Sequence, residues 1–345
     1  MASCIVTLSS VLAIVGNSLN IIVLTTRKFL TKPHAYFLIS LAVADLLTGM
    51  VDSFSVYSSI TYTWPYGEPF CLLTNYVREA LLEISLLMIL CLNLERYIAI
   101  SYPFRSKIWL TKNRSKAFIF LCWFVTFAFK IYLFFDVVYI VEYDKDIYAC
   151  TPEYDNYKGF AIFSSVAIEV PALIILTITS VKLIVALKRL NSRKHREMFH
   201  GSLQRRYSTN SRNLRKNLHG FKVLVVIATV SYISLLPSLS LRLLYISDND
   251  EEESAALNLS WALEFSFFWL ASCGSFANVF VYYFMDRNFS RCLRDMLQEL
   301  KRALKRKRTT VLSRGCPLKE NGSPTNQPLS VISDNRLNSQ ACTNV

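Results

Sequence analysis

The chain has 345 residues, of which 52% are apolar and 18% charged, and its mean hydropathy is +0.31. Soluble domains carry about 25% charged residues, whereas here apolar residues are gathered in long runs. These runs exclude two ordinary soluble domains, a disordered chain, a collagen-like chain and a disulfide-rich secreted chain.

Seven apolar runs predict seven membrane-spanning helices. A helix needs about 20 mostly apolar residues to cross the hydrocarbon core of a bilayer, and it satisfies its own backbone hydrogen bonds there. We therefore expect an all-α polytopic membrane protein, with a seven-helix bundle over residues 1–285. The runs lie at about 4–26, 35–60, 70–100, 117–141, 160–187, 221–246 and 257–284.

The first run begins within the first few residues. No Lys or Arg precedes Arg27, and the run is too long for the apolar part of a signal peptide, so we expect it to be a true span. The sequence leaves open whether no extracellular domain precedes this span or whether Met1 is not the true start.

Positive charge is concentrated on one side of the predicted spans. The loops after the first, third and fifth spans, with the tail and the adjoining helix ends, hold 33 of the 38 Lys and Arg but only 7 of the 25 Asp and Glu. Such loops stay in the cytosol, so we expect a multi-pass membrane protein with its N-terminus outside and its C-terminus cytosolic. This topology accounts for the net charge of +13, and nucleic acid is not an expected partner.

The nine cysteines are scattered, without the spacing of a metal site. Cys71 begins the third span on the outer side, and Cys150 lies in the outer loop after the fourth span. Since both face an oxidising compartment, we predict a disulfide between them.

Polar or helix-breaking residues interrupt the apolar runs, and their order is distinctive. They are Gly16-Asn17; Leu38-Ile39-Ser40-Leu41-Ala42-Val43-Ala44-Asp45-Leu46-Leu47; Trp64-Pro65-Tyr66-Gly67 before Cys71; Glu95-Arg96-Tyr97, with Pro103 following; Trp123, Pro171 and Pro237; and Asn278-Val279-Phe280-Val281-Tyr282, with Phe289 seven residues later. Over about residues 10–297 this pattern resembles the rhodopsin-like (class A) G-protein-coupled receptors, without indicating a subfamily.

The resemblance implies a plasma-membrane receptor, not an enzyme, that converts binding of an extracellular small molecule or short peptide into activation of a heterotrimeric G protein. It assigns the coupling role to Glu95, Arg96, Tyr97, Asn278 and Tyr282. A helix of the G protein would enter a groove at the cytosolic end of the bundle.

Four polar residues are expected to converge midway through the bundle: Asn17, Asp45, Ser85 and Asn278. A buried carboxylate in a membrane must be paired, hydrated or protonated. The resemblance implies a sodium pocket at Asp45, and a structural polar cluster without an ion stays open as the alternative. We expect no other metal or cofactor. Retinal is excluded because Ser272 stands where opsins carry the retinal-binding Lys.

Several positions of the activation machinery depart from the family pattern. The span-six Trp is missing from Ser234-Leu235-Leu236-Pro237, and Val279 replaces the span-seven Pro. Thr179 stands at the family's span-five Tyr, and Asn217 at the acid that normally holds the conserved Arg. Because one inter-helix ion pair is lost, we expect raised basal activity.

Charged residues in the outer halves of the spans form the candidate ligand pocket: Arg78, Glu79, Glu83, Glu169, Arg242 and Glu264. The two Arg side chains can clamp a carboxylate or phosphate, or they can pair with the neighbouring Glu residues. Because acids outnumber bases, a zwitterionic ligand, a cationic ligand or a short peptide fits equally well. Arg78 stands where amine receptors carry an Asp, which disfavours a conventional monoamine receptor.

Beyond span seven, residues 286–300 predict an amphipathic helix on the inner leaflet of the lipid membrane, with Cys292 as a lipidation candidate. Residues 301–345 are expected to be a largely disordered cytosolic tail whose Ser and Thr can recruit arrestin. The terminal Thr343 and Val345 fit a PDZ-binding C-terminus.

Three other classes of function compete with a signalling receptor. A decoy or scavenger of receptor fold would bind ligand without coupling, and the altered switch positions favour this alternative. A transporter is disfavoured because no internal repeat is found. An intramembrane enzyme is disfavoured because no catalytic motif is found.

Overall fold

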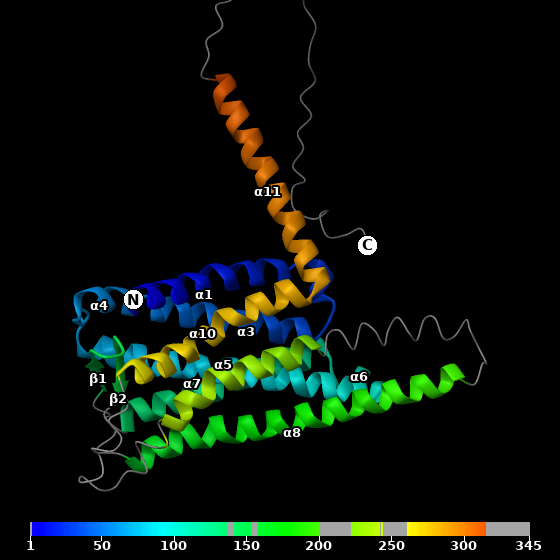
Figure 1. Ribbon diagram of the computed structural model, residues 1–345, viewed down its shortest axis with the longest axis horizontal. Helices are drawn as coiled ribbons and strands as arrows, with labels where there is room; N and C mark the ends of the chain where they lie inside the picture. The colour runs from blue at the N-terminus through cyan, green and yellow to red at the C-terminus, as the bar shows by residue number, and fades with distance from the viewer. Residues whose placement is uncertain are drawn as a thin grey trace, which may run out of the picture.

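Seven long helices form one bundle in the computed structural model, which describes residues 2–136, 141–152, 158–199, 222–241, 243 and 261–314. They run alongside one another in Figure 1. They are α1 (Ala2–Leu24), α3 (His34–Asp52), α5 (Glu68–Ser101), α7 (Lys112–Asp136), α8 (Lys158–Phe199), the helix Lys222–Leu241 and α10 (Trp261–Met285). The short helices are α2 (Arg27–Leu30), α4 (Phe54–Thr61) and α6 (Pro103–Trp109), and α11 (Arg287–Arg314) follows α10.

Within the described part of the chain, six helices are long and apolar enough to cross a membrane. The remaining long helix, α5, has 34 residues and carries several charged residues along its length. Its charges are tolerable because more than half of α5 is buried in the bundle. Among its residues, Leu81, Ile84, Leu86, Met88 and Leu92 are all less than 2% exposed.

The outward faces of the bundle are apolar. On α7, Phe120 and Phe124 are 71% and 60% exposed, and Ile174 of α8 is 54% exposed. Large exposed apolar faces are unusual in water but match the acyl chains of a bilayer. The arrangement therefore fits a bundle with a packed interior and a lipid-facing exterior.

Small residues let α1 approach its neighbours closely. A Cβ added to Gly16 would lie 2.9 Å from Val279 Cγ2 of α10, and one added to Gly49 of α3 would lie 2.7 Å from Ala13 Cβ. Close backbone approach at Gly and Ala is a common mode of helix association in membranes. Helix α1 is thus fitted tightly against both α3 and α10.

A β-hairpin covers the outer end of α5. The strands β1 (Val141–Asp144) and β2 (Ala149–Pro152) pair antiparallel, with Tyr143 opposite Cys150. The Cys71–Cys150 disulfide attaches β2 to the start of α5. The Tyr143 hydroxyl donates a hydrogen bond to the Ser58 carbonyl at 3.2 Å, and burial raises the pKa of Tyr143 to about 12. This hairpin was not part of the all-α prediction, although the disulfide that fixes it was.

Two helices are longer than the sequence patterns suggested. Helix α8 continues to Phe199 instead of ending near 187, and α11 continues to Arg314 instead of ending near 300. Neither extension contains Gly or Pro, and both are rich in Lys, Arg and Leu, which favour helix. Figure 1 shows α8 reaching beyond the bundle and α11 pointing away from it.

Candidate functional site

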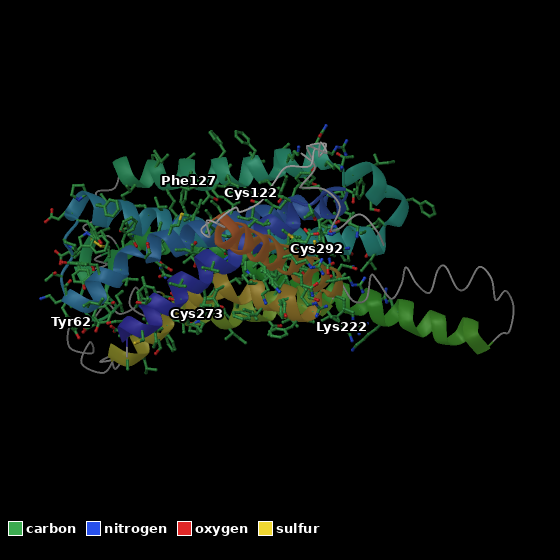
Figure 2. The ribbon with its side chains drawn as sticks, turned by 90° about the horizontal axis from the view of Figure 1, so that it is seen from above. Tyr62, Cys122, Phe127, Lys222, Cys273 and Cys292 are labelled. Carbon is green, nitrogen blue, oxygen red and sulfur yellow. A yellow bond between two sulfur atoms is a disulfide. The ribbon has the colours of Figure 1, made fainter. Side chains whose placement is uncertain are left out.

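Three of the predicted coupling residues, Glu95, Arg96 and Tyr97, lie near the end of α5 that the charge pattern assigns to the cytosol. Arg96 Nε lies 3.4 Å from Glu95 Oε2, and His34 Nδ1 of α3 lies 3.9 Å from Glu95 Oε1. Glu95 is buried, whereas about a quarter of the Arg96 side chain is exposed. The pair therefore keeps its carboxylate inside and offers part of its guanidinium to a partner. Figure 2 shows Tyr62 at one end of the bundle and Lys222 toward the other.

Tyr282 marks the junction between α10 and α11. Its ring centroid lies 6.0 Å from that of Phe289, and both side chains are buried. Its hydroxyl is buried and has no hydrogen-bond partner among the described residues. Tyr97, by contrast, packs edge-on against Tyr102 after the coupling pair, with centroids 6.4 Å apart. The predicted coupling residues thus occupy α5 and α10 without forming one contact cluster.

Asp45 is the centre of a polar network in the middle of the bundle. Ser85 Oγ donates to its Oδ1 at 2.8 Å, and Asn278 Nδ2 donates to its Oδ2 at 3.0 Å. Ser275, a residue that the sequence pattern did not single out, also hydrogen-bonds to this carboxylate. The network joins α3, α5 and α10 around a carboxylate that is 1% exposed.

Asn17 lies behind this network instead of on the Asp45 carboxylate. Its Nδ2 donates to the carbonyl oxygens of Ala13 and Ser275, each at 3.0 Å, and its Oδ1 accepts from Asn20 Nδ2 at 3.3 Å. Asn17 therefore ties α1 to α10 through the backbone at Ser275.

The network offers the oxygen donors that a hard cation prefers. Asn278 Oδ1 is buried and lacks a hydrogen-bond partner in the described structure, and it belongs to the side chain that contacts Asp45. Carboxylate, amide and hydroxyl oxygens are ligands of this type. The residues present therefore fit a small cation at Asp45.

Arg78, a predicted ligand-pocket residue, is bound by other side chains of the bundle. Its Nε donates to Asp52 Oδ1 at 3.0 Å, and its Nη2 donates to Ser272 Oγ at 2.8 Å and to the Phe268 carbonyl at 3.3 Å. Its guanidinium carbon lies 3.8 Å from the centroid of the Phe268 ring. Arg78 therefore links α5 to α3 and α10, and its acidic partner is Asp52 of α3.

Glu79 and Glu83 face the opposite side of α5. Lys130 Nζ of α7 lies 3.2 Å from Glu79 Oε2 and 2.7 Å from Glu83 Oε1. Glu169 of α8 is within electrostatic range of Lys130 and Glu83. Sequence reasoning missed Lys130 and Asp52, although both are charged residues in apolar runs and carry the signal that singled out Asp45.

The predicted ligand-pocket residues thus divide into groups instead of forming one ring. Arg78 belongs with α3 and α10, whereas Glu79, Glu83 and Glu169 belong with α7 and α8. Glu264 lies half-buried in the first turn of α10. Arg242 lies outside the described residues, as do Asn217, Thr343 and Val345.

Of the two cysteine predictions, the structure tests the disulfide, and the lipidation of Cys292 stays a prediction. The Cys71–Cys150 disulfide is confirmed, with a Cα–Cα distance of 5.5 Å. Cys292 is only 2% exposed and belongs to the same buried cluster as Phe289 and Leu293. Cys292 is also disulfide-bonded in this structure, so its acylation would require a free thiol and a side chain that has left that cluster.

Comparison with known proteins agrees with this architecture. The family model described as 7 transmembrane receptor (rhodopsin family) matches residues 16–282. The structure of squid rhodopsin superposes with a TM-score of 0.73 at 14% identity, covering 84% of this chain and 82% of that one. Such low identity shows the fold alone. The predicted all-α seven-helix membrane bundle is thereby confirmed.

The similar relatives are receptors by name. The neuromedin U receptor homolog nmur-2 of Caenorhabditis elegans is 33% identical over 39% of this chain and 33% of its own length. The alpha-1A adrenergic receptor of Oryzias latipes is 30% identical over 51% and 37%, and the human thyrotropin-releasing hormone receptor is 33% identical over 36% and 31%. The matches thus span about a third of each relative's length.

A bundle of seven membrane helices with the Cys71–Cys150 disulfide, the Asp45 network and the Glu95–Arg96 pair defines a multi-pass membrane receptor fold. Because the family match covers most of the bundle, this chain belongs to the rhodopsin family of seven-transmembrane receptors.

Proposed function

We propose that this protein converts the binding of an extracellular ligand into activation of a heterotrimeric G protein. The observation that supports it most is the Glu95–Arg96 pair at the end of α5, in a chain that matches the rhodopsin family over residues 16–282. The relatives named for neuromedin U, thyrotropin-releasing hormone and adrenergic ligands support a receptor for a short peptide or a small molecule.

The coupling step follows from the burial of the pair. Glu95 is enclosed by the bundle, so it holds the neighbouring Arg96 against the protein in the resting arrangement. A partner helix that offers carbonyl or carboxylate oxygens competes with Glu95 for the guanidinium. Entry of such a helix requires the cytosolic ends of the neighbouring helices to separate.

The location and orientation form a second part of the proposal. The excess of Lys and Arg in three loops and the tail supports a cytosolic C-terminus, and the disulfide supports an oxidising environment on the opposite side. Both are consistent with the plasma membrane. Arrestin and a PDZ protein are proposed partners of the tail.

The Asp45 network is the proposed site of a sodium ion. Asp45, Ser85 and Asn278 would hold the ion, and its positive charge would neutralise the buried carboxylate. Asn17 would act as a positioning residue, because its contacts fix the α10 backbone at Ser275.

The alternative function is a decoy that binds ligand without coupling. Its support is the set of altered switch positions, of which Thr179, Leu235 and Val279 lie in the described helices. The Ser234 hydroxyl bonds to its own helix at Val230, and a Cβ on Gly274 would lie 3.0 Å from Ser234 Oγ. A small residue thus packs against α10 directly before Leu235, which stands at the family's Trp position.

G-protein activation without added ligand distinguishes these functions. Dissociation biosensors for each Gα class would be expressed in living cells with wild type or with Arg96→Ala at matched surface density. We expect basal activation of at least one class by wild type and its loss in the variant. Lys301→Ala, which removes an exposed charge from α11, is the matched control and should signal normally. Equal activation by wild type and Arg96→Ala would contradict the coupling role, and silence of both would favour the decoy.

A further inference from the structure

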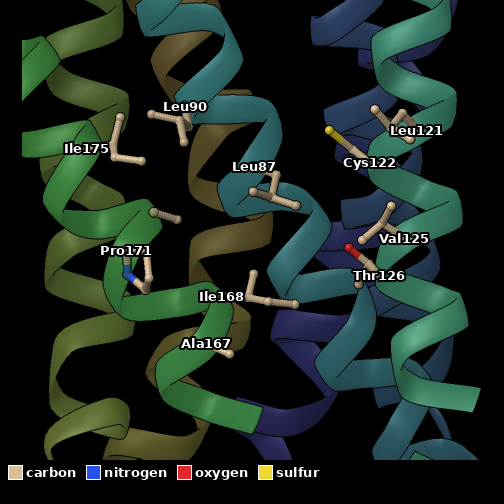
Figure 3. Close-up of a pocket in the computed structure, with 11 residues that line it drawn as sticks. Leu87, Leu90, Leu121, Cys122, Val125, Thr126, Ala167, Ile168, Pro171 and Ile175 are labelled. Atoms are coloured by element: carbon tan, nitrogen blue, oxygen red, sulfur yellow. The ribbon is translucent and has the colours of Figure 1, made fainter. Parts of the chain in front are cut away.

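The thiols of Cys91 on α5 and Cys122 on α7 form a pair inside the bundle. Their side chains hydrogen-bond to each other, and both are free cysteines. Cys91 is 7% exposed and belongs to the main apolar core, against which the half-buried Cys122 packs. Figure 3 shows the Cys122 sulfur directed from α7 toward α5. The two thiols are therefore close enough to react one after the other.

One member of the pair lines a groove between α5, α7 and α8. The groove has a volume of about 350 Å³, which is at the lower end of the range for ligand pockets. Cys122 lines it together with Leu87 and Leu90 of α5 and Pro171 of α8, as Figure 3 shows. Cys91 directly follows Leu90 and is not among the lining residues. Cys122 is thus the thiol that a molecule in the groove meets first.

The groove opens toward the lipid. Among its lining residues, Leu121 and Val125 are 52% and 50% exposed and Ile175 is 42% exposed, so the rim belongs to the outward face of the bundle. The lining is almost entirely apolar. A molecule dissolved in the bilayer can therefore reach Cys122 directly, and a hydrocarbon chain is the part that matches the lining.

This arrangement differs from that of a cysteine that only fills space. A packing cysteine behaves as a small apolar residue, and it needs neither a second thiol in contact nor a path from outside. A redox-sensing cysteine needs both, because an accessible thiol is oxidised first and a neighbouring thiol then completes the disulfide. Cys122 meets the first requirement, and Cys91 meets the second.

We propose that Cys91 and Cys122 form a membrane-facing redox pair that is oxidised by a lipid hydroperoxide, the peroxidised form of an unsaturated acyl chain. The hydrocarbon chain occupies the apolar groove, and the hydroperoxide group lies at the Cys122 sulfur. The site goes beyond the proposed function, because its chemistry does not require G-protein coupling.

The reaction has two steps. In the first, the Cys122 sulfur bonds to the terminal oxygen of the hydroperoxide, the O–O bond breaks, and the departing oxygen takes the thiol proton, which gives a sulfenic acid and a lipid alcohol. In the second, the Cys91 sulfur bonds to the Cys122 sulfur, the S–O bond breaks, and the hydroxyl leaves as water with the Cys91 proton. Two electrons thus pass from the two thiols to the hydroperoxide.

The product is a disulfide between α5 and α7. Cys91 precedes Arg96 by five residues, which is about 8 Å along the helix. The bond therefore fixes α5 to a neighbouring helix close to the Glu95–Arg96 pair.

The test uses purified full-length protein in nanodiscs of saturated phosphatidylcholine, which is not itself peroxidised. The protein is treated with cumene hydroperoxide, which enters the lipid, or with hydrogen peroxide, which stays in water. Remaining thiols are alkylated after denaturation, and the peptides are identified by mass spectrometry before and after reduction. We expect a reducible Cys91–Cys122 cross-link that forms about tenfold faster with cumene hydroperoxide. Recovery of both cysteines as alkylated thiols would overturn the proposal, and equal rates would overturn the route through lipid.

Single substitutions assign the order of the steps. Cys91→Ser removes the second step, so Cys122 should accumulate as a sulfenic acid that dimedone traps. Cys122→Ser removes the first step, so Cys91 should remain a thiol. Cys273→Ser, which removes another half-buried thiol, is the matched control and should form the cross-link at the wild-type rate. Sulfenic acid at Cys91 in the Cys122→Ser variant would overturn the assigned order.

A further variant tests the groove and leaves both thiols in place. Ala167→Trp fills the groove from α8, so the cross-link should form more slowly with cumene hydroperoxide. Ala262→Trp, at an exposed position of α10, is the matched control and should react as wild type does. A wild-type rate in Ala167→Trp would overturn the groove as the binding site. None of these outcomes depends on Arg96 or on a G protein, so the proposed receptor function stands or falls separately.

Discussion

The adjacent residues Arg78 and Glu79 of α5 belong to two separate buried ion-pair clusters, which face different helices. Arg78 has one carboxylate, Asp52, and hydrogen bonds to Ser272 and to the Phe268 carbonyl. One residue later, Glu79 belongs to a group in which Lys130 faces two carboxylates. Successive residues of a helix point in directions about 100° apart. Helix α5 can therefore contact α3 and α10 through Arg78 on one side and α7 and α8 on the other.

The difference lies in the kind of contact that each cation makes. Arg78 joins three helices through one carboxylate and two further hydrogen bonds. Lys130 joins α5 to α7 through ion pairs with two carboxylates of the same helix. Three substitutions would break or sharpen this comparison.

The largest effect is expected from Lys130→Met. The substitution leaves Glu79 and Glu83 facing each other without their cation, and breaking a buried pair costs about 3–5 kcal/mol. Surface expression should fall strongly and Tm should drop, as measured by cell-surface labelling and by unfolding of purified protein. The triple variant Lys130→Met/Glu79→Gln/Glu83→Gln should recover most of the loss. If the triple variant were no more stable than Lys130→Met, charge imbalance would not be the cause.

An intermediate effect is expected from Asp52→Asn. The amide oxygen still accepts from Arg78 Nε, but the counter-charge is lost, so the cost should be about 1–3 kcal/mol. The same thermal unfolding measurement applies. Asp146→Asn is the matched control, because Asp146 is exposed in the hairpin turn and should leave Tm unchanged. A loss of stability as large as that of Lys130→Met would contradict the claim that the hydrogen bonds to Ser272 and Phe268 also stabilise the buried Arg78 side chain.

The smallest effect is expected from Ser272→Ala. It removes one of the hydrogen bonds of Arg78 and leaves Asp52 and the Phe268 carbonyl, so stability should fall by about 1 kcal/mol. A double-mutant cycle with Asp52→Asn measures whether the two partners act together. We expect the double variant to be less stable than the sum of the single effects predicts, because Arg78 then lacks both its counter-charge and the Ser272 hydroxyl. Strict additivity would show that the partners act independently.

Sequence patterns predicted the polar network at Asp45 but not the ion pairs that Asp52 and Lys130 form. Asp45, Ser85 and Asn278 were expected to meet, and hydrogen bonds join them, because each occupies a position fixed by a recognisable motif. Asp52 and Lys130 belong to no such motif. Which carboxylate each cation faces depends on the rotation of α3 and α7 about their axes relative to α5, and side-chain packing determines that rotation.

The outer hairpin shows a similar division. The pairing of Cys71 with Cys150 followed from their placement on one side of the membrane, but the strands around Cys150 were not predicted. Short strands carry little periodic signal, and here the disulfide and the contact of Tyr143 with Ser58 hold them in place.

The contact between Gly16 and Val279 has a mechanical consequence. Without a proline at this point, α10 retains every backbone donor and lacks the usual cause of a helix kink. The Val279 side chain fills the space above Gly16, so an inward swing of the lower half of α10 would press directly on α1. We therefore expect α1 and α10 to move together in any switching motion.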